Sequence, residues 1–103
     1  MDTIVCDWQI VTVEDDGHRI GQVLWGICVE DKSFRFGKGD YICTSRIVKI
    51  NPKTNLLKTA SGSIYKVIGE GKKVAIDYRD FELLRHGFSP EQIEALKTTT
   101  FRH

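Results

Sequence analysis

The sequence predicts an α+β protein that is mainly β: a strongly bent antiparallel sheet or small β-barrel followed by two short C-terminal helices. Three observations lead to this prediction. Residues 3–14 and 18–31 are long runs with apolar side chains on both faces, as in strands that coil around a barrel. Residues 38–71 divide into three short strands joined by two tight turns. After residue 77 the apolar residues follow helical spacing.

The first two predicted strands form a hairpin. Asp15, Asp16 and Gly17 between them are typical of a hairpin turn. Gly21 and Gly26 fall inside the second strand, where glycine indicates a β-bulge or the close approach of another backbone. Beyond this hairpin we expect a further short strand at residues 34–36.

The central stretch is the clearest part of the chain. It is expected to hold strands at 41–50, 56–59 and 63–68, with turns at 51–55 and 61–62. The alternation of apolar residues changes phase near Ser45 and Arg46, which predicts a β-bulge that bends the strand. The alternative is that both faces of this strand are partly buried. A meander of this size must pack one face on an apolar partner.

The C-terminal region is predicted to be a helical hairpin that follows one more short strand at 74–76. Asp77 is the expected cap of the first helix, and Gly87 its left-handed stop. Ser89 is the expected cap of the second helix, with Gln92 completing a capping box.

The chain shows no repeat, linker or low-complexity segment, so we expect one domain over residues 1–103. Within it, residues 1–76 form the sheet or barrel and residues 77–98 the helical hairpin. Residues 99–103 are expected to be a frayed tail.

Charge is unevenly distributed although the net charge is only +1. Residues 1–31 hold one base against seven acids, residues 32–73 ten bases against two acids, and residues 74–103 four bases against five acids. In one interpretation, acidic and basic strands lie side by side and neutralise each other. In the other, residues 32–73 present a basic face to nucleic acid or to an acidic protein.

Seven residues of the basic stretch are the candidate binding residues: Lys38, Tyr41, Arg46, Lys49, Lys58, Tyr65 and Lys66. Aromatic side chains among cations suit single-stranded nucleic acid, whose bases stack on aromatic rings while its phosphates meet the cations. The same aromatic residues are equally suited to a hydrophobic core.

The three cysteines, Cys6, Cys28 and Cys43, are expected to be buried, reduced thiols of a cytoplasmic protein, because their number is odd and none forms a CxxC pair. Cys43 comes nearest to an activated thiol, since Arg46 follows it closely. We expect no metal site, cofactor or catalytic residue. No apolar run is long enough for a membrane span.

The segments GDYICTSRIV, TASGSIYKV and LLRHGFSPEQIEAL resemble a group of small proteins without an assigned mechanism that are carried on bacterial mobile DNA, in phages, integrative elements and integron cassettes. The resemblance covers residues 34–97. It implies a cytoplasmic accessory protein of bacterial or phage origin, and brings no catalytic motif with it.

Together these observations predict a non-catalytic small binding module, a protein-interaction accessory factor of bacterial mobile DNA with a protein partner or a homodimeric state. One alternative is a nucleic-acid-binding β-barrel that uses residues 32–73. The other is a small enzyme with a thiol or histidine site.

Overall fold

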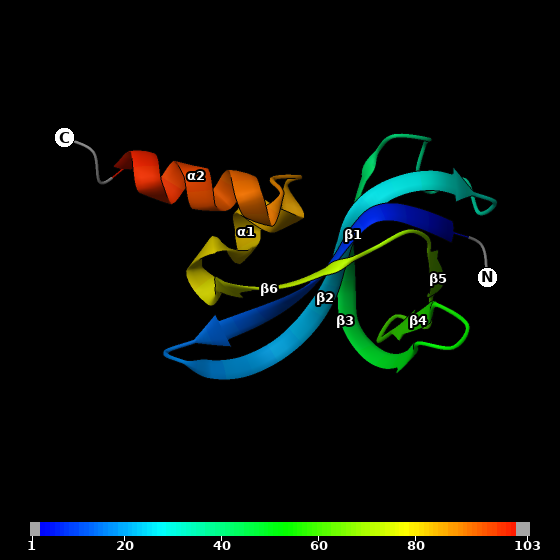
Figure 1. Cartoon of the computed structure of the whole chain (residues 1–103), viewed down its shortest axis with the longest axis horizontal. Helices are drawn as coiled ribbons and strands as arrows, with labels where there is room; N and C mark the ends of the chain where they lie inside the picture. Colours follow the sequence, from blue (N-terminus) through cyan, green and yellow to red (C-terminus); the bar gives the residue numbers. More distant parts are fainter. Residues whose placement is uncertain (1–2, 101–103) are drawn as a thin grey trace.

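The computed structural model describes residues 3–100 and contains six strands and two α-helices (Figure 1). The elements are β1 (Thr3–Asp15), β2 (His18–Asp31), β3 (Tyr41–Asn51), β4 (Leu56–Thr59), β5 (Ile64–Val67), β6 (Lys72–Asp77), a 3₁₀ turn η1 (Tyr78–Asp80), α1 (Phe81–Arg85) and α2 (Pro90–Thr100). The predicted class, α+β and mainly β with two short C-terminal helices, is confirmed.

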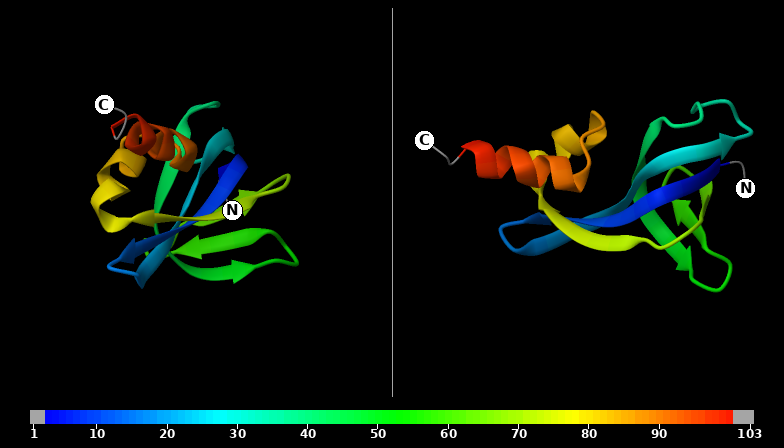
Figure 2. Two further views of the ribbon diagram at one scale, coloured as in Figure 1. Left: turned by 60° about the vertical axis from the view of Figure 1, so that its left-hand side comes forward. Right: turned by 45° about the horizontal axis from the view of Figure 1, so that its top comes forward.

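Five strands close into a small barrel. Each of β1 to β4 pairs with the next strand in sequence, and β5 pairs with β1 to complete the ring. β6 then extends the sheet along the outer part of β1. Figure 2 shows the long β1–β2 hairpin leaving the barrel, with β6 beside it and the helices over that extension.

The sheet is mixed, which corrects the prediction of an antiparallel sheet. β5 and β6 both run parallel to β1, β5 beside Thr3–Val5 and β6 beside Gln9–Glu14. The two strands therefore lie in tandem along a single edge of β1, separated by residues 68–71. Their direction follows from closure of the ring, which no local pattern of residues encodes.

Two hydrophobic cores share the β1–β2 hairpin. The barrel core contains Val5, Ile10, Leu24, Cys28, Ile42, Leu57, Tyr65 and Val67. The helix core lies between the outer part of the hairpin, β6 and the helices, and contains Val11, Val13, Val23, Trp25, Ile76, Leu84 and Ile93. The hairpin strands are apolar on both faces because one face fills the barrel and the other receives the helices.

A bulge in β1 changes which of its residues point inward. The pairing of β1 with β2 shifts between Cys6 and Gln9, where Asp7 has φ of 48°. Gly26 of β2 lies opposite this bulge, and a Cβ there would overlap the Val5 side chain. The predicted close approach at Gly26 is therefore confirmed.

The predicted bulge in β3 is also present. The β2–β3 register pairs Trp25 with Cys43 and Val23 with Arg46, which leaves one extra residue on β3. Both residues between these pairs, Thr44 and Ser45, lie in the irregularity, where Thr44 is buried and Ser45 is exposed. The bulge turns β3 so that its first half completes the barrel beside β2 and its second half pairs with β4.

The predicted strand at residues 34–36 is wrong. Phe34 has φ of 61° and is 92% exposed, so an extended strand cannot continue through it. The buried Asp31 carboxylate instead folds this segment into a turn. It accepts hydrogen bonds from the backbone N–H groups of Ser33 (3.0 Å), Arg35 (2.8 Å) and Phe36 (2.9 Å), and from the Ser33 and Thr3 hydroxyls.

The helix caps follow the sequence prediction. Asp77 accepts a hydrogen bond from the Arg79 N–H, and the first helix begins as the 3₁₀ turn η1. Ser89 and Gln92 form the capping box, with reciprocal backbone-to-side-chain bonds of 2.8 and 3.1 Å. α2 continues to Thr100, beyond the expected end at residue 98, and the rest of the expected tail, residues 101–103, lies outside the described residues.

Gly26 and Gly21 provide a matched test of the close approach in β2. We expect Gly26→Ala to lower the free energy of unfolding by roughly 1–3 kcal/mol, because its methyl group would collide with Val5 and approach the Cys6 carbonyl. At Gly21 the nearest atoms belong to the flexible Arg46 side chain at 3.4 Å, so Gly21→Ala should stay within about 1 kcal/mol of the parent protein. Urea denaturation measures both, and equal losses would contradict this packing.

Asp31→Asn is expected to lower the free energy of unfolding by about 2 kcal/mol at neutral pH, since hydrogen bonds to a charged group are worth roughly 1.5–3 kcal/mol. Burial alone would raise the pKa of Asp31, but hydrogen bonds from Ser33, Phe36 and Thr3 hold that pKa well below its ordinary value.

Because the folded pKa of Asp31 is depressed, its contribution to stability is present above the unfolded pKa of about 3.9 and is lost as pH falls toward the folded value. Urea titrations between neutral and acid pH should show this loss in the parent protein and a smaller one in Asp31→Asn. Asp40→Asn is the control, since that carboxylate accepts one bond, from the Gly37 N–H at 2.8 Å. If the free energy of unfolding falls equally with pH in the parent protein and in Asp31→Asn, Asp31 is not the group that causes the loss.

Candidate binding surfaces

Three of the seven candidate residues share one outward face of the barrel. Lys49 of β3 lies directly opposite Lys58 of β4, and Lys66 of β5 lies opposite Leu56 of β4. Ile64 lies opposite Lys58 and is exposed. We call these residues, Lys49, Leu56, Lys58, Ile64 and Lys66, the lysine face. Four of them, all but Lys66, line a shallow depression of about 210 Å³.

The bases of residues 32–73 are not neutralised by direct ion pairs with the acidic hairpin. Over residues 3–100, the one ion pair that involves them joins Lys72 to Glu91 of α2, with 3.6 Å between Nζ and Oε2. Lys49 and Lys58 lie opposite each other although like charges at such positions destabilise a sheet. The charge asymmetry of the sequence therefore persists at the surface of the lysine face.

Three other candidates lie away from the lysine face. Lys38 is exposed in the loop before β3. The Tyr41 hydroxyl donates a hydrogen bond of 2.8 Å to the Arg85 carbonyl, and its ring packs on Gly87, so Tyr41 anchors the end of α1. The aliphatic part of Arg46 lies against Gly21.

The seventh candidate, Tyr65, is a core residue. It is 4% exposed and belongs to the barrel core. The Arg35 guanidinium lies 5.8 Å from the centre of its ring and 5.2 Å from that of Phe36, so these rings hold a cation within the protein. The lysine face contains no aromatic side chain on which a base could stack.

An apolar groove of about 670 Å³ lies between η1–α1 and the β2–β3 strands. Its apolar lining is Val13, Ile20, Val23, Tyr78 and Phe81, and Arg46 and Arg85 are its cations. Ile20 and Tyr78 are 53% and 55% exposed. We call this feature the η1–α1 groove. Sequence reasoning missed it because its sides come from elements far apart in the chain.

The cysteines are free thiols, but only one of the three is buried. Cys28 lies in the barrel core, whereas Cys6 and Cys43 are half-buried, which corrects the expectation for those two. Cys43 lines the η1–α1 groove. Burial raises the pKa of its thiol to about 11, against the opposing influence of Arg85. At neutral pH Cys43 is therefore a protonated thiol and a weak nucleophile.

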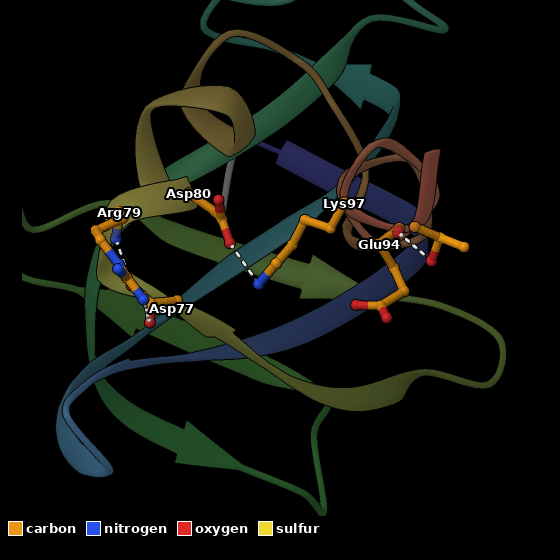
Figure 3. A network of polar contacts seen from close by, with 6 residues as sticks. Asp77, Arg79, Asp80, Glu94 and Lys97 are labelled. Carbon is orange, nitrogen blue, oxygen red and sulfur yellow. Dashed lines mark hydrogen bonds and ion pairs between the residues drawn. The ribbon is translucent and has the colours of Figure 1, made fainter. Parts of the chain in front are cut away.

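Two acidic side chains at the end of β6 and in η1, those of Asp77 and Asp80, are each paired with a base (Figure 3). Lys97 of α2 lies 3.2 Å from Asp80, and Arg79 lies 3.0 Å from Asp77. Hydrogen bonds from Arg79 lower the pKa of Asp77 to about 2, which keeps it ionised and unsuited to act as a general acid. No cluster of three or more potential metal-ligating residues occurs within residues 3–100.

Comparisons with protein-family models, with curated proteins and with solved structures gave no match. Within the described part of the chain, no helix is long and apolar enough to span a membrane.

The like-charge pair on the lysine face yields a stability prediction. Lys58→Glu places opposite charges across β3 and β4, and we expect it to raise the free energy of unfolding by about 0.5–1 kcal/mol at low salt. The gain should shrink as salt rises, because these side chains are exposed. Lys53→Glu, in the turn outside the strand ladder, is the control for net charge. Equal effects of the two substitutions in urea denaturation would show that Lys49 and Lys58 do not repel each other.

Proposed function

We propose that this protein is a non-catalytic binding module whose η1–α1 groove accepts an apolar segment, carrying an acidic residue, of another protein. One observation supports this most directly: the groove combines an apolar lining and exposed Ile20 and Tyr78 with two arginines, and no acidic residue lines it. Contiguous exposed apolar surface of this kind is typical of interaction sites.

The charges of the groove favour an acidic occupant. The Arg46 stem packs on Gly21, and its guanidinium makes no ion pair within residues 3–100. Arg85 is bound to Glu82 at 2.9 Å, and both side chains are largely exposed. A carboxylate that approaches the groove therefore meets a guanidinium available for a bidentate contact.

Binding without catalysis is supported by the chemistry of the groove. The one thiol that lines it belongs to Cys43, and the raised pKa of this thiol disfavours the reactive thiolate. Free thiols in all three cysteines support a reducing compartment, and with the resemblance noted above we propose a cytoplasmic accessory factor of bacterial mobile DNA.

The test uses two labelled peptides, one alternating leucine with glutamate and one alternating leucine with lysine, followed by fluorescence anisotropy. We expect the glutamate peptide to bind more tightly. Ile20→Asp should weaken its binding roughly tenfold to a hundredfold, because an apolar contact of about 1.5–3 kcal/mol is lost. Arg46→Glu should move the preference toward the lysine peptide by about two- to fivefold, the value of an exposed charge contact.

Lys38→Glu makes the same charge change outside the groove and should leave the peptide preference unchanged. Equal binding of both peptides to the parent protein and to Ile20→Asp would refute the groove as the site. Light scattering tests the predicted homodimer. If the parent protein is a dimer and Ile20→Asp is a monomer, the groove binds a second copy of the chain, contrary to this proposal.

A second candidate function, binding of nucleic acid, is favoured by the lysines of the lysine face, which make no ion pair within residues 3–100. Lys49, Lys58 and Lys66 would contact phosphates, and the absence of a stacking ring there favours duplex over single strand. Three phosphate contacts should make binding weaker as salt rises. A plot of the logarithm of the association constant against the logarithm of the salt concentration should have a slope of about −2 to −3.

Filter binding of a short DNA duplex over a range of salt measures this slope. Lys58→Gln should reduce it by about one, whereas Lys32→Gln, outside the lysine face, should leave it unchanged. Undetectable binding at low salt, or equal slopes for both variants, would dismiss nucleic acid at this face.

A further inference from the structure

A third pocket, of about 340 Å³, is lined by both tryptophans of the chain and by two residues that each hold a buried polar atom without a partner in residues 3–100. It lies where the β1 bulge meets β2, the start of β6 and the start of α2. Gln9 and Trp25 both line it, and each is 6% exposed. Gln9 Oε1 and Trp25 Nε1 have no hydrogen-bond partner among the described residues.

The orientation of the Gln9 amide is fixed by α2. Its Nε2 donates a hydrogen bond of 2.9 Å to Glu91 Oε1, and the other oxygen of Glu91 lies 3.6 Å from Lys72 Nζ. Turning the amide over would place its oxygen against this carboxylate, so Oε1 remains the unpaired atom. Trp25 Nε1 can only donate. Two residues that line the pocket thus bring one unpaired acceptor and one unpaired donor, both buried beneath its surface.

These two atoms come from neighbouring residues on one face of the sheet. Gln9 lies directly opposite Trp25 in the β1–β2 register, which places the two side chains side by side. A group that offers an N–H next to a carbonyl could satisfy both atoms at once. Buried polar groups in native proteins are nearly always satisfied, so the unpaired pair calls for a ligand of that kind.

The rest of the pocket narrows the class of ligand. Trp8 holds its indole flat against Gly71 and donates a hydrogen bond of 3.1 Å to the Gly69 carbonyl, so its ring is fixed in place. Indole walls favour a flat ligand. Asp7, Glu70 and Glu91 outnumber Lys72 around the pocket, which disfavours phosphates and carboxylates.

From this geometry we infer that the pocket binds a small, uncharged, planar cyclic amide, such as the N–H and C=O edge of a free pyrimidine base. Its N–H donates to Gln9 Oε1 and its carbonyl accepts from Trp25 Nε1, with the ring against indole. Glu91, whose side chain is about half exposed, is the group that moves to admit it. This site is separate from the η1–α1 groove and does not depend on the proposed function.

Uracil is the probe, and 1,3-dimethyluracil is its matched control, since it keeps the ring and both carbonyls but has no N–H. The chain has two tryptophans, so an ¹H–¹⁵N spectrum of the parent protein contains two indole signals, and Trp8→Phe identifies the one from Trp25. We expect uracil to move the Trp25 signal downfield as its N–H gains an acceptor. Dimethyluracil should bind at least about fivefold more weakly, because it leaves Gln9 Oε1 unsatisfied.

Gln9→Met removes the acceptor while keeping the length of the side chain. This substitution should weaken the binding of uracil by about two- to tenfold and leave the affinity for dimethyluracil unchanged. Uridine 5′-monophosphate should bind more weakly than uracil because of the surrounding acids. The comparison of uracil with dimethyluracil needs only the parent protein, so it remains decisive if Gln9→Met does not fold.

Three results would overturn the inference. The first is equal binding of uracil and dimethyluracil. The second is no response of either indole signal to millimolar uracil. The third is a Trp25 N–H that is already downfield and protected from exchange in the free protein, since Trp25 would then be donating to Gln9 Oε1 within the chain.

Discussion

The whole structure depends on one hairpin serving two cores. β1 and β2 contribute Val5, Ile10 and Leu24 to the barrel core, and Val11 and Val23 to the helix core. Strict alternation along β1 would place Ile10 and Val5 on opposite faces, yet both lie in the barrel core. The bulge between Cys6 and Gln9 shifts the alternation of β1 by one residue, so that Val5 and Ile10 point to the same face. Without it, one of the two cores would receive polar side chains.

The same bulge creates the polar pocket. By changing the phase of β1, it brings Gln9 onto the face that carries Trp25, beneath the start of α2. Glutamine is an unusual residue at so buried a position, and among Trp8, Ile10 and Val11 it is the one polar side chain of an apolar run. The amino-acid sequence therefore marks Gln9 as a residue of interest. It does not mark the partner of Gln9, because Glu91 lies at the far end of the chain.

Features set by neighbours in sequence could be predicted, and those set by ring closure could not. The capping box of Ser89 and Gln92 and the bulge after Cys43 are local, and both follow from the sequence. The parallel pairing of β5 and β6 with β1 depends on contacts between distant segments. The turn at residues 32–36 depends on Asp31, a single carboxylate whose burial the sequence does not reveal.

The candidate residues show where alternation alone could have improved the prediction. Tyr65 and Lys66 are adjacent in β5, so their side chains must point to opposite faces, and one binding surface cannot include both. Once Lys66 faces outward, Tyr65 must enter the barrel, where it is found.

Four of the ten bases of residues 32–73 lie on the two candidate surfaces. Lys49, Lys58 and Lys66 gather on the outer strands of the barrel, and Arg46 joins Arg85 at the groove. The two surfaces differ in what surrounds the charge. Around the lysines the strands form only a shallow depression, so the attraction of a partner there is mainly coulombic. Such attraction weakens as salt rises and does not require a partner of a particular shape. Beside Arg46 the larger apolar groove adds contact area that excludes water, which strengthens a charge contact and demands a matching shape. A specific partner is thus better accommodated at the groove, and the lysines are better suited to attract an acidic partner from a distance.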